Sequence, residues 1–129
     1  MIPTTQAEIH ESSITTFWME NNVLYSVTKD TPRTLSNIKE HLGQQKKVAL
    51  GKVCCVVDVS NVGVIDKEGR DYLKKEYGKL FKAIAFVTTS MPGRFLATLM
   101  LTMSPPSVPA KIFSCRENAD AWIRQYASN

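Results

Sequence analysis

The segment from Lys52 to Leu80 constrains the fold more than any other part of the sequence. It begins with the apolar run Val53-Cys54-Cys55-Val56-Val57 and continues into the polar stretch Asp58-Val59-Ser60-Asn61. The sequence Asp66-Lys67-Glu68-Gly69 then opens a helical pattern over residues 67–80. A nearly all-apolar strand is typical of a parallel sheet that is covered on both faces. Ligands of such sheets bind at the carboxyl ends of the strands, so we expect any functional site at this edge, which we call the rim.

Strands and helices alternate along the rest of the chain. Two β-prone runs, 13–20 and 23–29, meet at Asn21-Asn22, a pair that tolerates positive φ and predicts an antiparallel hairpin. We expect Thr31 to cap the next helix, with Pro32 at its first position and Gly43 near its end. Further strands are expected at 52–59, 83–87 and 110–113, with helices at 67–80, 94–103 and 116–126.

The resulting order, ββαβαβαβα, predicts an α/β sandwich. Its sheet should be mixed, mostly parallel and five-stranded, with four helices. We expect a single domain over residues 13–129, preceded by a polar N-terminal arm at residues 1–12.

Length and composition are those of one domain with one core. The chain has 129 residues, of which 43% are hydrophobic. No apolar run approaches the roughly 20 residues of a membrane helix, and the N-terminus lacks signal-peptide features, so a cytoplasmic location is expected. Cys54 and Cys55 are neighbours whose side chains point to opposite faces of a strand, which predicts small core residues.

The net charge is only mildly basic, at +4. Basic residues do gather on or just after the 67–80 helix, but they spread over about half of its circumference. We interpret them as a solvated face and expect no nucleic-acid partner. The residues are Arg70, Lys74, Lys75, Lys79 and Lys82.

The sequence contains an ordered set of short motifs: Val56-Val57-Asp58-Val59-Ser60 with Ile65-Asp66-Lys67-Glu68-Gly69, then Met91-Pro92-Gly93-Arg94-Phe95, Val108-Pro109-Ala110-Lys111-Ile112-Phe113 and Ala119-Asp120-Ala121-Trp122-Ile123. In this order they resemble the STAS (anti-sigma-factor antagonist, SpoIIAA-like) superfamily. More closely, the chain looks like small uncharacterised bacterial proteins grouped with STAS and CRAL-TRIO lipid-binding domains. The resemblance spans residues 13–127 and implies a SpoIIAA-like sandwich.

The chain departs from these antagonists at the start of the 67–80 helix. There the antagonists carry an Asp-Ser-Ser-Gly type sequence whose first Ser is phosphorylated by a kinase. Lys67 occupies that position here, while Asp66 and Gly69 are retained. The resemblance therefore implies the same turn without the usual phosphorylatable hydroxyl.

The rim provides the candidate residues for binding a ligand or partner. They are Asp58, Ser60, Asn61, Asp66, Lys67, Ser90 and Arg94. Asp66 and Ser90 also suit helix capping, and Ser60 and Asn61 suit local backbone hydrogen bonds equally well. Arg94 lies in a first helical turn, where a cation is unfavourable, so either an anion or partner contact or plain solvation explains it.

The 94–103 helix is apolar around most of its circumference. Its candidate interface or pocket residues are Phe95, Leu96, Leu99, Met100 and Met103. An outer helix of a small sandwich buries one face on the sheet, so the other face requires a cover. That cover is a partner subunit, an apolar ligand or the 104–109 loop, and the sequence leaves the three open.

No residue pattern indicates catalysis. His10 and His41 have no acid or Cys at catalytic spacing, and no nucleotide, metalloprotease or hydrolase motif occurs. We therefore expect a non-catalytic interaction or regulatory module with a protein partner, as a homodimer, without cofactor or metal. The alternative is a small carrier or sensor for an apolar, lipid-like ligand, and an enzyme is the third hypothesis.

Overall fold

The computed structural model describes residues 1–62, 65–102 and 107–127, which form one six-stranded sheet and four helices. In chain order the elements are β1 (His10–Glu11), β2 (Thr15–Glu20), β3 (Val23–Thr28), α1 (Leu35–Ala49), β4 (Val53–Asp58), α2 (Lys67–Leu80), β5 (Phe81–Val87), α3 (Met91–Thr102), β6 (Ala110–Phe113) and α4 (Arg116–Ala127). None of the described helices is long and apolar enough to cross a membrane.

The strands lie side by side in sequence order. The pairs β1–β2 and β2–β3 are antiparallel, and β3, β4, β5 and β6 are parallel. The prediction of a mixed, mostly parallel sheet is thus confirmed, but the count of five strands was wrong. The additional strand is β1, where His10 pairs with Phe17, inside the segment that we expected to be an arm. A two-residue strand is too short to show a hydrophobic period.

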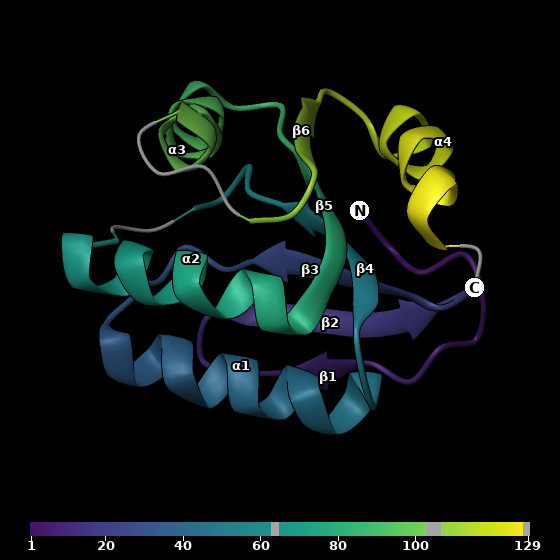
Figure 1. The fold of residues 1–129 in the computed structure, drawn as a ribbon, viewed down its shortest axis with the longest axis horizontal. Helices are drawn as coiled ribbons and strands as arrows, with labels where there is room; N and C mark the ends of the chain where they lie inside the picture. The colour runs from purple at the N-terminus through teal and green to yellow at the C-terminus, as the bar shows by residue number, and fades with distance from the viewer. Residues whose placement is uncertain (63–64, 103–106, 128–129) are drawn as a thin grey trace.

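The helices cover the sheet unequally (Figure 1). Helices α1, α2 and α3 lie on one face, and α4 lies on the other, beside the N-terminal segment. Right-handed crossovers between successive parallel strands place the three connecting helices on the same face. Two cores result, and Cys55 belongs to the first and Cys54 to the second, so the two thiols do point to opposite faces.

The hairpin turn is as predicted, whereas the start and end of α1 are not. Asn21 and Asn22 have φ of 50° and 68°, as a two-residue turn between antiparallel strands requires. The cap of α1 is Thr34 rather than Thr31, because the Thr34 hydroxyl accepts the Asn37 N–H at 3.1 Å. Gly43 lies inside the helix, which continues to a left-handed Leu50 with φ of 55°.

Helix α3 begins three residues earlier than expected, at Met91. The Ser90 hydroxyl accepts the Gly93 N–H at 3.1 Å, and the Ser90 carbonyl accepts the Arg94 N–H at 3.0 Å. A side chain at position 93 would collide with the Val59 carbonyl and the Thr88 hydroxyl, so glycine lets α3 start against the sheet. The predicted end of the helix, at Met103, lies outside the described residues.

Candidate functional site

The rim brings together the ends of β4 and β5, as the sequence predicts for parallel strands. The Asp58 carboxylate accepts the Ser60 N–H at 2.8 Å, and the Ser60 hydroxyl accepts the Thr89 N–H at 3.0 Å. The Ser90 hydroxyl donates to the Ser60 carbonyl at 2.8 Å. These rim groups therefore satisfy one another and hold the two strand ends in register.

The turn before α2 is built around Asp66 and Gly69. The Asp66 carboxylate caps the helix by accepting the Gly69 N–H at 2.8 Å. A Cβ on Gly69 would lie 2.7 Å from Ile38 Cδ1, so glycine lets the start of α2 approach α1. The Lys67 side chain is 84% exposed and lies 3.4 Å from the Asp71 carboxylate.

Two rim residues remain available to a partner. Asn61 and Arg94 are exposed, and neither side chain has a hydrogen bond or ion pair with any described residue. Arg94 lies in the first turn of α3, where the helix dipole gives it no stabilisation. Of the candidate rim residues, these two and Lys67 are the ones whose polar ends point to solvent.

The apolar residues of α3 divide between the inside and the outside of the molecule. Met100 is 3% exposed and packs in the core, whereas Phe95 is 71% exposed. Leu96 and Leu99 line a surface groove of about 310 Å³ between α3 and the start of α2, which we call the α3 groove. Its other lining residues are Val62, Ile65, Arg70, Pro92 and Phe95. Met103 lies outside the described residues.

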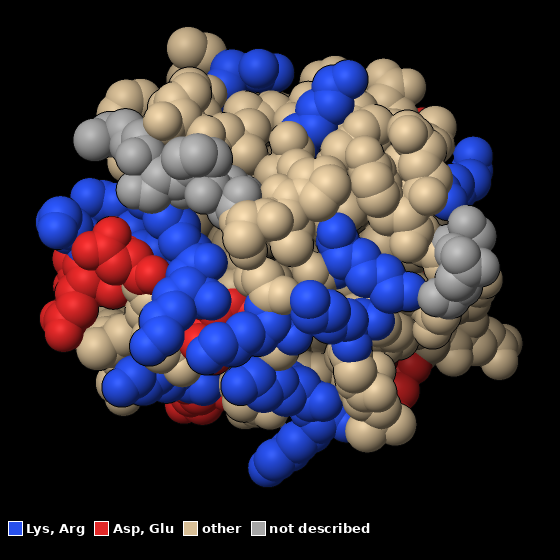
Figure 2. Space-filling view, in the orientation of Figure 1, with Lys and Arg blue, Asp and Glu red and all other residues tan. Residues whose placement is uncertain are grey.

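The adjoining surface is basic. Figure 2 shows Lys and Arg side chains gathered over the face formed by α1 and α2. Some of these cations are paired, because the buried Glu76 carboxylate lies 3.1 Å from Lys79 and 3.6 Å from Lys46. The face nevertheless presents a positive surface close to the α3 groove, since α2 contributes five basic residues, Lys67, Arg70, Lys74, Lys75 and Lys79.

A cavity of about 60 Å³, partly open to the surface, lies between the sheet and helices α1, α2 and α3. We call it the inner cavity. Most of its wall is apolar, including Ile38, Leu73, Phe86, Leu96 and Met100. Six residues bring polar atoms to it: Thr15, Ser26, Thr28, Arg33, His41 and Tyr77.

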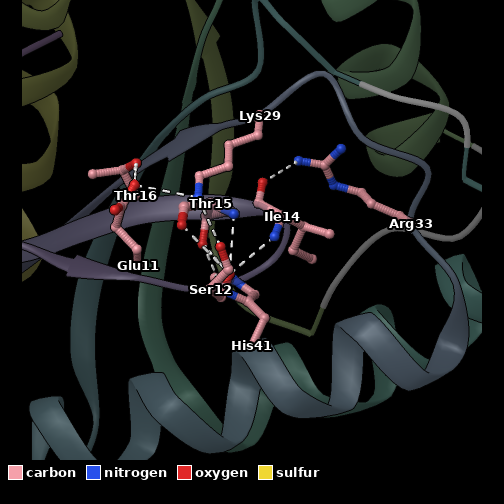
Figure 3. Close-up of polar contacts among 8 residues, drawn as sticks. All are labelled: Glu11, Ser12, Ile14, Thr15, Thr16, Lys29, Arg33 and His41. Carbon is pink, nitrogen blue, oxygen red and sulfur yellow. Dashed lines mark hydrogen bonds and ion pairs between the residues drawn. The ribbon is translucent and has the colours of Figure 1, made fainter.

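Arg33 is the charged residue among the described residues that line this cavity. It is 6% exposed, and its guanidinium donates to the Ile14 carbonyl at 3.2 Å (Figure 3) and, at 3.4 Å, to the Thr31 carbonyl. No described carboxylate forms an ion pair with it. Burial accordingly lowers the pKa of Arg33.

His41 and Ser26 complete the polar part of the wall. The His41 Nδ1 atom lies 2.8 Å from the Thr15 hydroxyl. Burial, and secondly the charge of Arg33, lower the pKa of His41 to about 3, so the imidazole is neutral at pH 7. The Ser26 hydroxyl is buried without a hydrogen-bond partner among the described residues. Burial also raises the pKa of Tyr77.

Only a weak signal for this cavity is present in the sequence. Ser26 and Thr28 share a strand face with the core residue Leu24, so polar residues stand at core-facing positions of β3. Arg33 and His41 carry no such signal, because arginine and histidine after a strand or on a helix are usually exposed.

A second polar cluster lies on the opposite face of the sheet, and its charges are paired. The buried Glu20 carboxylate accepts from Trp18 Nε1 at 2.6 Å and from the Thr4 N–H at 2.9 Å, and it forms an ion pair with Arg116 at 3.2 Å. Arg116 also pairs with Asp120 at 3.1 Å. Burial alone would raise the pKa of Glu20, but the hydrogen bonds from Thr4 and Trp18 outweigh it and hold the pKa at about 2.

The Tyr25 hydroxyl joins this cluster by donating to Asp120 at 2.7 Å. Burial and that hydrogen bond raise the pKa of Tyr25 to about 12. The cluster thus connects the N-terminal segment, the hairpin and α4 through groups that satisfy one another.

The sheet, its three connecting helices and the C-terminal helix on the other face define a SpoIIAA-like fold. The structure is similar to that of an uncharacterised protein of the DUF3478 family with a SpoIIAA-like fold from Shewanella loihica. The two share 14% sequence identity with a TM-score of 0.55, over 95% of this chain and 98% of the other. The predicted fold is confirmed.

The chain belongs to the family described as Domain of unknown function (DUF7793), whose model matches residues 17–127. No curated protein matches the chain.

Proposed function

We propose that the chain is a non-catalytic interaction module of STAS type that binds an acidic protein partner. Its docking surface consists of the α3 groove with the exposed rim residues Asn61, Lys67 and Arg94. The observation that supports this proposal most is the exposure of Phe95, 71%, beside an apolar groove. A large aromatic side chain next to a groove is typical of an anchor for a partner.

The charge around the groove favours an acidic partner over a second copy of the chain. Arg94 has no described partner, and the Arg70 guanidinium lies on the groove wall, where it donates to the Ile65 carbonyl at 3.0 Å. A second copy would bring the same positive charges to the interface. Complementary charge accelerates association and excludes like-charged surfaces.

The hydrogen bonds of the rim support a non-catalytic role. Asp58, Ser60 and Ser90 are engaged with backbone groups, and Asp66 caps α2. Lys67 stands, exposed, at the position that holds the phosphorylated serine in the antagonists. Regulation of this module would therefore act through its partner or a ligand rather than through phosphorylation at that turn.

The test compares variants of the docking surface. Proteins bound to the tagged chain in cells of its own host are identified, and the purified candidates are titrated against wild type, Phe95→Ser and Arg94→Ser. We expect Phe95→Ser to weaken binding by about tenfold or more, because an aromatic anchor is lost. Arg94→Ser should slow association and reduce its dependence on salt.

Leu50→Asn is the matched control, since Leu50 is 86% exposed at the far end of α1 and asparagine tolerates its backbone conformation. A partner that binds Phe95→Ser as tightly as wild type would refute the proposed surface. Sedimentation of the purified chain adds a second check. A dimer dissociated by Phe95→Ser would assign the surface to a second copy instead.

A further inference from the structure

We propose that the inner cavity binds a small organic monocarboxylate with a short apolar tail. Arg33 would hold the carboxylate, and the apolar wall would enclose the tail. This site lies beneath α3, whereas the docking surface lies on its outside, so neither proposal depends on the other.

The first observation is a buried cation without a counter-ion. Arg33 is 6% exposed, and its described contacts are two carbonyl oxygens. A guanidinium carries five N–H donors, of which these contacts use two, and its planar fork matches a carboxylate. Burying an unpaired charge is strongly unfavourable, so such a group requires an anion or an extensive set of acceptors.

The second observation is an unused hydroxyl on the same wall. Ser26 is 2% exposed and lines the inner cavity, and no described residue forms a hydrogen bond with its hydroxyl. Buried hydroxyls in proteins nearly always have a partner, so this group indicates a missing acceptor or donor. A carboxylate between Arg33 and Ser26 would supply acceptors to both.

The third observation is the neutrality of the remaining polar groups. His41 is engaged with the Thr15 hydroxyl and is neutral at pH 7, and Tyr77 is a neutral phenol. Arg33 is consequently the single charge among the described residues that line the inner cavity. The cavity is positive, which favours an anion over a neutral or cationic ligand.

The dimensions of the inner cavity set the size of the ligand. Its volume of about 60 Å³ exceeds the roughly 15 Å³ that one water needs, but it is far below the 300 Å³ or more of a drug-sized site. Ile38, Leu73, Phe86 and Met100 provide an apolar wall. These features fit an acid of about three to five carbons better than a long-chain lipid.

In the test, the wild-type chain is titrated with sodium salts of straight-chain acids from acetate to decanoate. Binding is measured by calorimetry and by the chemical shifts of the backbone amides. We expect butyrate to bind with a dissociation constant of about 0.1–1 mM, as befits so small a ligand. Butyramide, which has nearly the same shape and no charge, should bind at least tenfold more weakly. Butylamine should not bind. The shifts should be largest at Ser26, Arg33 and His41 and small at Asn61 and Phe95.

Arg33→Met should abolish butyrate binding, whereas Arg124→Ser, which removes an exposed arginine on α4, should leave it unchanged. Because Arg33→Met also removes two backbone contacts, the comparison of butyrate with butyramide on the wild type decides the matter if that variant does not fold. Equal binding of acid and amide, or no saturable binding of any acid, would overturn the proposal and leave the cavity to water. If affinity keeps rising with chain length up to decanoate, the ligand is a long-chain, lipid-like acid and not a short one, which would also overturn the proposal.

Discussion

Each face of the sheet carries one arginine that is withdrawn from solvent, Arg33 buried and Arg116 partly buried, and the two have opposite surroundings. On the α4 face, Arg116 is held between Glu20 and Asp120, with its guanidinium 4.0 Å from the centre of the Tyr25 ring. On the α1–α3 face, Arg33 contacts two carbonyl oxygens and no described carboxylate. The same side chain thus completes a closed structural cluster on one face and leaves an open site on the other.

The different surroundings of Arg116 and Arg33 follow from how the helices on each face are attached to the sheet. Helix α4 is the last element, and its polar contacts, with those of Thr4 to Glu20, tie both ends of the chain to the hairpin. Helices α1, α2 and α3 are each joined to strands at both ends, and α1 is also linked to α2 by the ion pair between Lys46 and the buried Glu76. Arg33 takes no part in that link, so its unpaired charge is better explained by binding than by stability.

The largest effect is expected from removing the paired arginine. Arg116→Ala leaves the Glu20 carboxylate buried without its cation, so the free energy of unfolding should fall by about 3–5 kcal/mol. Urea unfolding followed by tryptophan fluorescence measures it. Arg124→Ala, an exposed position on the same helix, should change it by less than about 0.5 kcal/mol. If Arg116→Ala lowers the free energy of unfolding no more than the control does, the cluster does not stabilise the attachment of α4 and the N-terminal segment to the hairpin.

Acid should begin to destabilise the α1–α3 face at a higher pH than the α4 face. The pKa of His41 is lowered from 6.5 to about 3, so below pH 6.5 the unfolded chain takes up a proton that the folded chain does not. Stability should fall by on the order of 2 kcal/mol between pH 6.5 and 4.5. His41→Gln should remove this dependence.

Glu20 acts only at lower pH. Its pKa is lowered from 4.5 to about 2, so the stability that it contributes is present above pH 4.5 and is lost as the pH falls towards 2. The loss should be on the order of 2 kcal/mol. Glu20→Gln should therefore alter the pH profile below pH 4.5 and not its slope above it. An unchanged wild-type slope in His41→Gln between pH 6.5 and 4.5 would contradict the assignment of that range to the α1–α3 face.

Sequence reasoning identified the fold because strand period, turn residues and chain order are local signals. The Asn21-Asn22 turn, the buried β4 run and the cap at Asp66 can each be predicted from a few neighbouring residues. The same reasoning placed the rim residues together, since parallel strands end at the same edge of a sheet. It failed at β1 and at the ends of α1, where pairing with β2 and the alternative cap Thr34 decided the outcome.

The inner cavity and the paired cluster could not be predicted in this way. His41 contacts Ser12 and Thr15, which come from a different part of the chain, and Arg33 lines the same cavity as His41. In the paired cluster, Glu20 and Arg116 are 96 residues apart in the sequence. A buried arginine has no local pattern, because its burial depends on which elements pack over it. A polar residue at a core-facing position of a strand, such as Ser26, is a local signal in the sequence that indicates such a cavity.

The smallest expected effect compares two buried serines. Ser12→Ala should destabilise the fold by about 1–2 kcal/mol, because its hydroxyl accepts the Ile14 N–H at 3.2 Å and the Thr15 N–H at 3.0 Å. Ser26→Ala should instead stabilise the free chain by roughly 1 kcal/mol, since it removes a buried hydroxyl without a partner. Urea unfolding measures both.

In saturating butyrate the Ser26→Ala variant should no longer be more stable than the wild type, because the wild-type hydroxyl then gains an acceptor that alanine cannot use. A destabilised Ser26→Ala chain without ligand would mean that water already satisfies this hydroxyl, and the contrast between the two faces would then rest on Arg33 alone.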